Sequence, residues 1–197
     1  MELRDQLELD PLSVLLTAEL AWSHAFPGNV DEGMRCSRQA LAMDPDFALA
    51  HYNLAQDYDA LGQLDASIEE ADLAARLSGR ASFTLALLGR VRARRGERAE
   101  ARAIAAELQE RAGRGEVVNH HVAVVLDALE ESDAALEWLE RACEAREPML
   151  AWLHVVPFGA FENLRKDARF DELLDRIGMA KQMRAASSHA AARSEDT

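Results

Sequence analysis

The sequence predicts an all-α fold in which helix–turn–helix repeats stack into an α-solenoid that ends in a C-terminal helical cap. The first observation is composition: the 197 residues are 49% hydrophobic but only 6% aromatic, and Ala and Leu, which favour helices, dominate. The second is a glycine that returns every 34 residues, because fixed periods of this length are typical of helical repeat proteins. The third is an apolar stripe near the C-terminus, which predicts a helix with one buried face.

The period is visible in several columns of the sequence. Gly28, Gly62 and Gly96 are each 34 residues apart, and one more step reaches Glu130. Small or aliphatic residues recur at the same step in further columns, which are Leu20, Leu54, Leu88 and Val122; Ala21, Ala55, Gly89 and Ala123; Gly33, Ser67, Ala101 and Ala135; and Ala40, Ala74 and Ala142, with Leu108 in the remaining place.

Each repeat is interpreted as two helices joined by a turn. In the second repeat we expect helices at 49–61 and 65–77, with Gly62 in the left-handed conformation that ends the first helix. Small residues such as Ala55 let antiparallel helices approach closely. One such hairpin cannot bury its own apolar face, so the copies are expected to stack. The four repeats span 14–47, 48–81, 82–115 and 116–149.

The second repeat also carries a family resemblance. The stretch HYNLAQDYDALGQLDASIEEADLAARL resembles the tetratricopeptide repeat (TPR), and the residues in register are Leu54, Ala55, Tyr58, Gly62, Ala66, Ser67 and Ala74. The resemblance covers about residues 14–149 and implies a right-handed α-solenoid whose first helices line a concave groove. The large aromatic residue usual near the start of a TPR is absent, because that column holds Thr17, His51, Leu85 and Asn119.

Both ends of the chain extend the repeat pattern. Residues 1–13 are expected to be the remnant of the second helix of an earlier repeat, since Asp10-Pro11 precedes Asp44-Pro45 by 34 residues. Residues 150–179, which concentrate Trp152, Phe158, Phe161 and Phe170, are expected to form the cap, and 180–197 a disordered tail. The stretch EWLERACEAREPMLAWLHVVPFGAFENLRKDARFDELLDRIG resembles the close of TPR arrays attached to bacterial serine/threonine kinases, adenylate cyclases and winged-helix regulators.

Charge and targeting signals narrow the partners. Against 22 Lys and Arg stand 35 Asp and Glu, a net charge of −13, so we expect neither nucleic acid nor a membrane surface as a partner. The opening MELRDQLELD lacks the apolar core of a secretory signal, and a cytoplasmic location is expected. Cys36 and Cys143 are interpreted as buried reduced thiols rather than as a disulfide or metal ligands.

No motif in the sequence predicts catalysis. There is no phosphate-binding glycine loop and no G-x-S-x-G elbow. His120 and His121 form the only histidine cluster, but adjacent helical residues point about 100° apart and are not expected to hold one metal ion. Glu116 and His120 together would supply only two ligands. We expect no enzyme activity, no catalytic residue, no metal and no cofactor.

The concave groove implied by the resemblance is the predicted binding site. Arg90 and Arg94, four residues apart, have two interpretations. They are either a fork-shaped site for a partner's carboxylate or phosphate or a solvated face paired with Glu97 and Glu100. The aromatic side chains either receive apolar groups or pack into the core. The predicted groove residues are Trp22, Phe26, Tyr52, Asn53, Gln56, Asp59, Phe83, Arg90, Arg94, His120, Val124 and Asp127.

One known TPR binding mode does not fit. Some TPR groups clamp the C-terminal carboxylate of a chaperone with Lys, Asn and Arg side chains, and Asn53 occupies one of those places. The other places hold Ala18, Trp22, Phe83 and Leu87. A co-chaperone of this kind is therefore not expected.

The leading functional hypothesis is a non-enzymatic protein-interaction module or scaffold that binds a peptide or a partner helix in the groove. One alternative is the C-terminal regulatory or sensor region of a larger bacterial signalling enzyme or transcriptional regulator. Another is self-association, in which the uncapped N-terminal face pairs with its copy in a homodimer.

Overall fold

The helical prediction is confirmed at the level of fold class. The structure is a computed structural model that describes residues 13–25, 29–148, 150 and 160–178, and every regular element within these ranges is a helix. The helices are α2 (Val14–Ala25), α3 (Val30–Met43), α4 (Ala48–Ala60), α5 (Leu64–Leu77), α6 (Ser82–Arg95), α7 (Arg98–Gly113), α8 (Asn119–Ala128), α9 (Ser132–Glu144), the 3₁₀ turn η2 (Leu164–Lys166) and α10 (Ala168–Arg176). The helix expected at 49–61 is α4 shifted by one residue, and the helix expected at 65–77 is α5 without its first residue.

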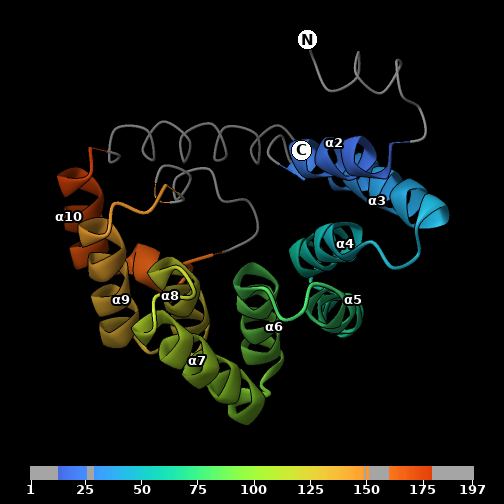
Figure 1. Cartoon of the computed structure of the whole chain (residues 1–197). Coiled ribbons are helices and arrows are strands. Elements are labelled where there is room, and N and C mark those ends of the chain that lie inside the picture. Colours follow the sequence, from blue (N-terminus) through green and yellow to red (C-terminus); the bar gives the residue numbers. More distant parts are fainter. Residues whose placement is uncertain (1–12, 26–28, 149, 151–159, 179–197) are drawn as a thin grey trace.

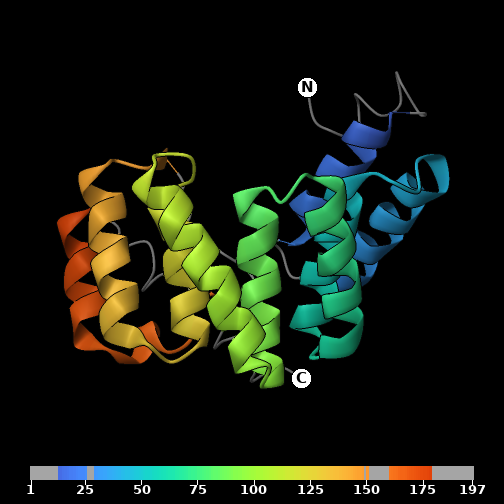
Figure 2. The same cartoon turned by 60° about the horizontal axis from the view of Figure 1, so that its bottom comes forward.

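The helices pack in successive pairs. Within each pair the two helices contact each other, and the first helices of neighbouring pairs also touch: α2 lies on α4, α4 on α6, and α6 on α8. Figure 1 shows the pairs along an arc, with α4, α6 and α8 toward its inner side and α5, α7 and α9 toward its outer side. Figure 2 shows the same helices side by side from another direction. We call the surface formed by α4, α6 and α8 the inner face.

The turn inside each described pair from α4 to α9 has the same geometry. Gly62, Gly96 and Glu130 have φ values of 70°, 91° and 64°, in the left-handed region. In each turn this residue donates its N–H to the carbonyl three residues earlier, and the next residue donates to the carbonyl five residues earlier, at 2.9 to 3.0 Å. These are the two hydrogen bonds of a glycine-type helix end. The left-handed conformation expected at Gly62 is confirmed, and Glu130 adopts it despite its Cβ.

Small side chains lie at buried contacts between the helices. Ala55 and Ala123 are fully buried, and Gly89 faces α8 so closely that a Cβ there would lie 2.8 Å from both methyl carbons of Val125. A continuous apolar core runs from α4 to α10 through these contacts. Because this core passes between α6 and α8, the small size of Gly89 lets the two helices pack closely on the inner face.

The described part of the expected cap packs on the last helix pair. The rings of Phe161 and Phe170 are 5.8 Å apart between centroids, and both side chains are buried. On α10, Leu173 and Leu174 are buried with Phe170. Ile177, the residue directly after the helix, is partly buried against the same core, as the stripe in the sequence predicts. Trp152, Phe158, residues 1–12 and residues 180–197 lie outside the described residues.

The structure also bears on the state of the two cysteines and on membrane-spanning helices. Cys36 and Cys143 are both free thiols, but Cys143 is only partly buried, contrary to expectation, because it packs at the margin of the core rather than inside it. Among the described residues, no helix combines the length and the apolar character needed to cross a membrane.

Candidate functional site

A small pocket opens on the inner face. Its volume is about 100 Å³, and residues four apart on each helix line it because positions i and i+4 share a helix face. We call it the inner pocket. Its lining residues are Tyr52 and Gln56 of α4; Phe83, Ala86, Leu87 and Arg90 of α6; His120, His121 and Val124 of α8; and Ala160 and Phe161 after the last pair.

Aromatic rings form much of its wall. Tyr52 and Phe83 meet edge to face, with centroids 5.0 Å apart and planes at 81°, an arrangement that aromatic pairs favour. Phe83 keeps 36% of its surface exposed, whereas Phe161 is only 1% exposed. The wall therefore has one ring that is already packed into the core and one that a partner can still cover.

The side chain of His120 is held by the carboxylate of Glu147, which follows α9. Its Nδ1 lies 2.9 Å from Oε2 of Glu147, and the same carboxylate accepts the backbone N–H groups of Asn119 and His120 at 2.5 and 3.1 Å. Glu147 thus caps the N-terminus of α8. Burial opposes its ionisation, but these hydrogen bonds hold the pKa of Glu147 below its usual value.

Burial favours the neutral form of both histidines of the pocket. Burial lowers the pKa of His120, and the hydrogen bond with Glu147 offsets only part of this effect. Burial, with a smaller contribution from His120, lowers the pKa of His121 to about 3. His121 places Nδ1 2.9 Å from Oγ of Ser82. Although neighbouring helical residues diverge at their Cβ atoms, the two rings have centroids only 4.1 Å apart.

Arg90 and Arg94 have an arrangement that neither interpretation of the sequence included. Both form ion pairs with Asp59, whose side chain is fully buried at the end of α4. The Arg90 side chain is 5% exposed and that of Arg94 is 30% exposed. The last turn of α4 lies beside α6, the first helix of the next pair. The guanidinium groups of Arg90 and Arg94 therefore hold the two pairs together through Asp59. Reversing both charges would bury like charges together and destabilise the fold.

The remaining predicted residues lie elsewhere. Asn53 is buried and donates to the carbonyl of Ala18 at 2.9 Å. Asp127 accepts the backbone N–H of Leu164 at 2.8 Å and so holds the segment that follows the last pair. Trp22 belongs to α2, but its side chain is not among those described, and Phe26 lies outside the described residues.

The inner pocket therefore gathers half of the predicted groove residues: Tyr52, Gln56, Phe83, Arg90, His120 and Val124. It does not gather Asn53, Asp59, Arg94 or Asp127. Sequence reasoning missed the other five lining residues, which are Ala86, Leu87, His121, Ala160 and Phe161. His121 could have been found from its place beside His120, whereas Phe161 has no periodic relation to the repeats.

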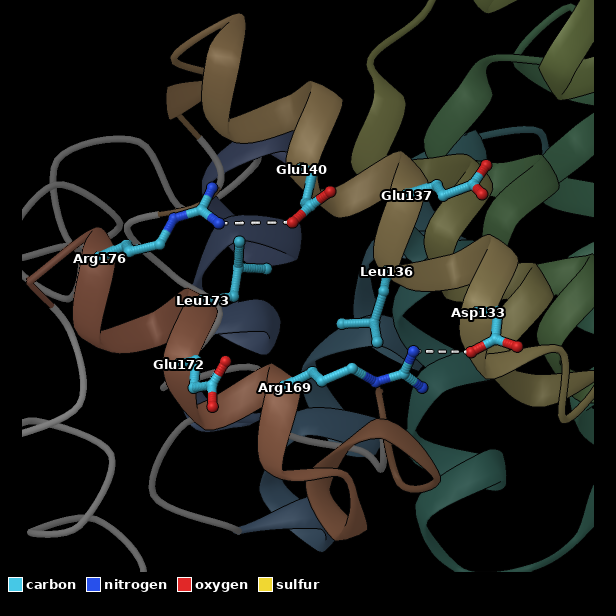
Figure 3. Close-up of a pocket in the computed structure, with 8 residues that line it drawn as sticks. All are labelled: Asp133, Leu136, Glu137, Glu140, Arg169, Glu172, Leu173 and Arg176. Carbon is cyan, nitrogen blue, oxygen red and sulfur yellow. Dashed lines mark hydrogen bonds and ion pairs between the residues drawn. The ribbon is translucent and has the colours of Figure 1, made fainter.

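A larger hollow lies between α9 and α10, with a volume of about 580 Å³ (Figure 3). Arg169 and Asp133, 2.8 Å apart, and Arg176 and Glu140, 3.4 Å apart, connect its two sides. These side chains are mostly exposed, and such ion pairs contribute little. The hollow is an open groove between α9 and α10 that is lined mainly by charged side chains. Because it offers little apolar surface to a partner, we assign the candidate site to the inner pocket.

In the part of the chain that the structure describes, no group of three or more His, Cys, Asp or Glu side chains is placed to hold a metal ion.

A scan against protein-family models finds no match, and a search of curated proteins finds none either.

Proposed function

We propose that this chain is a non-enzymatic protein-interaction module, a right-handed solenoid of TPR-type helix pairs that binds a peptide or partner helix along its inner face. The inner pocket receives one anchoring side chain of that partner. The observation that carries the proposal is an apolar, aromatic pocket on the inner face in which Phe83 remains 36% exposed.

The TPR-type fold is supported by features that repeat at the 34-residue step. The turns at Gly62, Gly96 and Glu130 share their φ region and their two hydrogen bonds. Small residues also recur at this step: Ala55 and Ala123 are fully buried, and Gly89 leaves no room for a Cβ beside Val125. Repetition of both turn and contact is expected when equal helix pairs stack in one direction.

Binding is supported by the size and chemistry of the pocket. Ligand sites for cofactors and drug-sized molecules occupy roughly 300–1,000 Å³, whereas the inner pocket has about 100 Å³. A space of this size suits one side chain, and anchors of this kind carry most of the energy of protein interfaces. Burial lowers the pKa of both His120 and His121 and so weakens both rings as bases, which supports a binding role over acid–base catalysis.

The test compares two exposed apolar residues. Peptides are selected from a random displayed library on the wild-type protein, and their Kd values are measured by fluorescence polarisation against Phe83→Ala and Leu77→Ala. The two residues are 36% and 38% exposed, but Leu77 ends α5, outside the inner pocket.

We expect Phe83→Ala to raise Kd at least tenfold and Leu77→Ala to leave it within a factor of two. Circular dichroism of both variants controls for folding. Selected peptides that bind Phe83→Ala as tightly as wild type, or no selected peptide at all, would refute binding through the inner pocket.

A further inference from the structure

The tautomer of His120 is determined by its neighbour. Glu147 is ionised, and an ionised carboxylate can only accept hydrogen bonds. The short contact between Nδ1 of His120 and Oε2 of Glu147, 2.9 Å, therefore requires the proton to be on Nδ1. In a neutral ring the other nitrogen, Nε2, then carries a lone pair and is a hydrogen-bond acceptor.

This acceptor has no partner within the described chain. Hydrogen bonds of the His120 side chain to described residues are limited to that with Glu147, although the residue is only 6% exposed and lines the inner pocket. Nε2 is not among the buried side-chain atoms without a partner, so water reaches it while the pocket is empty. An occupant that fills the pocket displaces that water. It must then bring an O–H or N–H donor to Nε2, because a purely apolar occupant would leave the acceptor buried and unpaired, which is unfavourable.

The rest of the pocket selects the shape of the occupant. Tyr52, Phe83, Val124 and Phe161 surround the space with rings and a branched aliphatic group. An apolar cavity of about 150 Å³ holds benzene, and the inner pocket, at about 100 Å³, is smaller. It therefore takes at most one six-membered ring, part of which would lie against the exposed surface of Phe83. The fused rings of tryptophan are too large for it.

We propose that the inner pocket recognises a tyrosine side chain of the partner, whose phenol O–H donates to Nε2 of His120 while its ring packs between Phe83 and Val124. This inference rests on the proposed function and names the residue that anchors the partner. It also predicts discrimination: phenylalanine fills the same space but leaves the acceptor unpaired, and sites that bind a hydroxyl reject the analogue that lacks it.

The probes are p-cresol and toluene, which are the side chains of tyrosine and phenylalanine without a backbone. Toluene leaves water more readily than p-cresol, so an apolar pocket without an acceptor binds toluene more tightly. We expect the opposite order in the wild-type protein, with p-cresol binding at least about tenfold more tightly. Chemical shifts of Val124 and of the His120 ring nitrogens, followed by NMR titration at pH 7.5, report both Kd values and the hydrogen bond.

The matched variant is His120→Asn. The amide N–H₂ of asparagine replaces the Nδ1 donor toward Glu147, but nothing replaces Nε2. We expect this variant to keep the helix content and to prefer toluene. Equal affinities or a toluene preference in the wild type, or no titration by either probe, would overturn the tyrosine assignment while the Phe83→Ala peptide test still decides the proposed function independently.

A metal ion is the competing occupant, because a histidine whose Nδ1 is bound to a carboxylate is a frequent metal ligand and the His121 ring is close by. Zn²⁺ is therefore titrated in the same NMR experiment. Tight, stoichiometric Zn²⁺ binding at both imidazoles that p-cresol fails to displace would overturn the proposal in favour of a metal site.

Discussion

Replacing Gly89 by alanine tests the contact between α6 and α8 that shapes the inner face. An added Cβ would lie 2.8 Å from both methyl carbons of Val125 and 3.1 Å from Cγ2 of Ile104. Carbon atoms in contact prefer about 3.5–4.0 Å, so the helices would have to separate by roughly 0.7 Å or more. Val125 is fully buried and, as a β-branched residue in a helix, has essentially one rotamer.

Two opposing effects set the magnitude for Gly89→Ala. Alanine favours the helix over glycine by about 1 kcal/mol, while overpacking a core costs about 1–3 kcal/mol and occasionally more. Because two contacts fall far below the normal range and both reach one rigid side chain, we take the upper part of that range. The net loss in the free energy of unfolding is then about 2 kcal/mol, or a fall in Tm of about 4–8 °C for a chain of this length.

Urea denaturation followed by circular dichroism at 222 nm measures this change. Gly113→Ala is the matched control, since Gly113 ends α7 and a Cβ there meets nothing within 4 Å. The control variant should be stabilised by up to about 1 kcal/mol. If Gly89→Ala proves as stable as wild type, the close approach of α6 and α8 is wrong.

Two further predictions concern a turn and a buried carboxyl. Glu130 has φ 64°, a conformation that is strained for a residue with a Cβ, and the equivalent residues of the other repeats are glycines. Glu130→Gly should therefore raise the free energy of unfolding by about 1 kcal/mol. An unchanged urea midpoint would show that the backbone is not strained there. Asp57 is 2% exposed, and burial raises its pKa from 3.8 to about 7, with Arg38 opposing. Between these two pKa values the folded chain keeps a proton that the unfolded chain has released, so the carboxyl makes stability fall as pH rises, by up to about 1.4 kcal/mol per unit. Asp57→Asn should therefore exceed wild type in stability above pH 7 and lose that advantage near pH 4; a difference in urea midpoint independent of pH would refute this assignment.

Local features of the fold follow from the sequence by itself. The 34-residue step marks the turn at Gly62, where the left-handed conformation is observed, and the apolar stripe identifies the buried face of α10 through Phe170 and Leu174. The reason is that helix ends and helix faces depend on residues within a few positions of one another, so composition and periodicity report them directly.

The inner pocket could be predicted only in part. Tyr52, Phe83 and His120 follow from the repeat, because each lies on the same face of a first helix. Their neighbours Arg90 and Asp59 share that periodicity, yet they form a buried clamp between helix pairs. Periodicity assigns a face to a residue, but it does not say whether the residue binds a partner or its own neighbour.

Tertiary structure alone decided the chemistry of the pocket. Glu147 lies 27 residues after His120, and Phe161 enters the wall from beyond the last helix pair. Such contacts depend on how far each helix pair is rotated and shifted against the next, and on which rotamer each side chain adopts in the packed core. No local pattern encodes those quantities, because they result from the packing of all the pairs together.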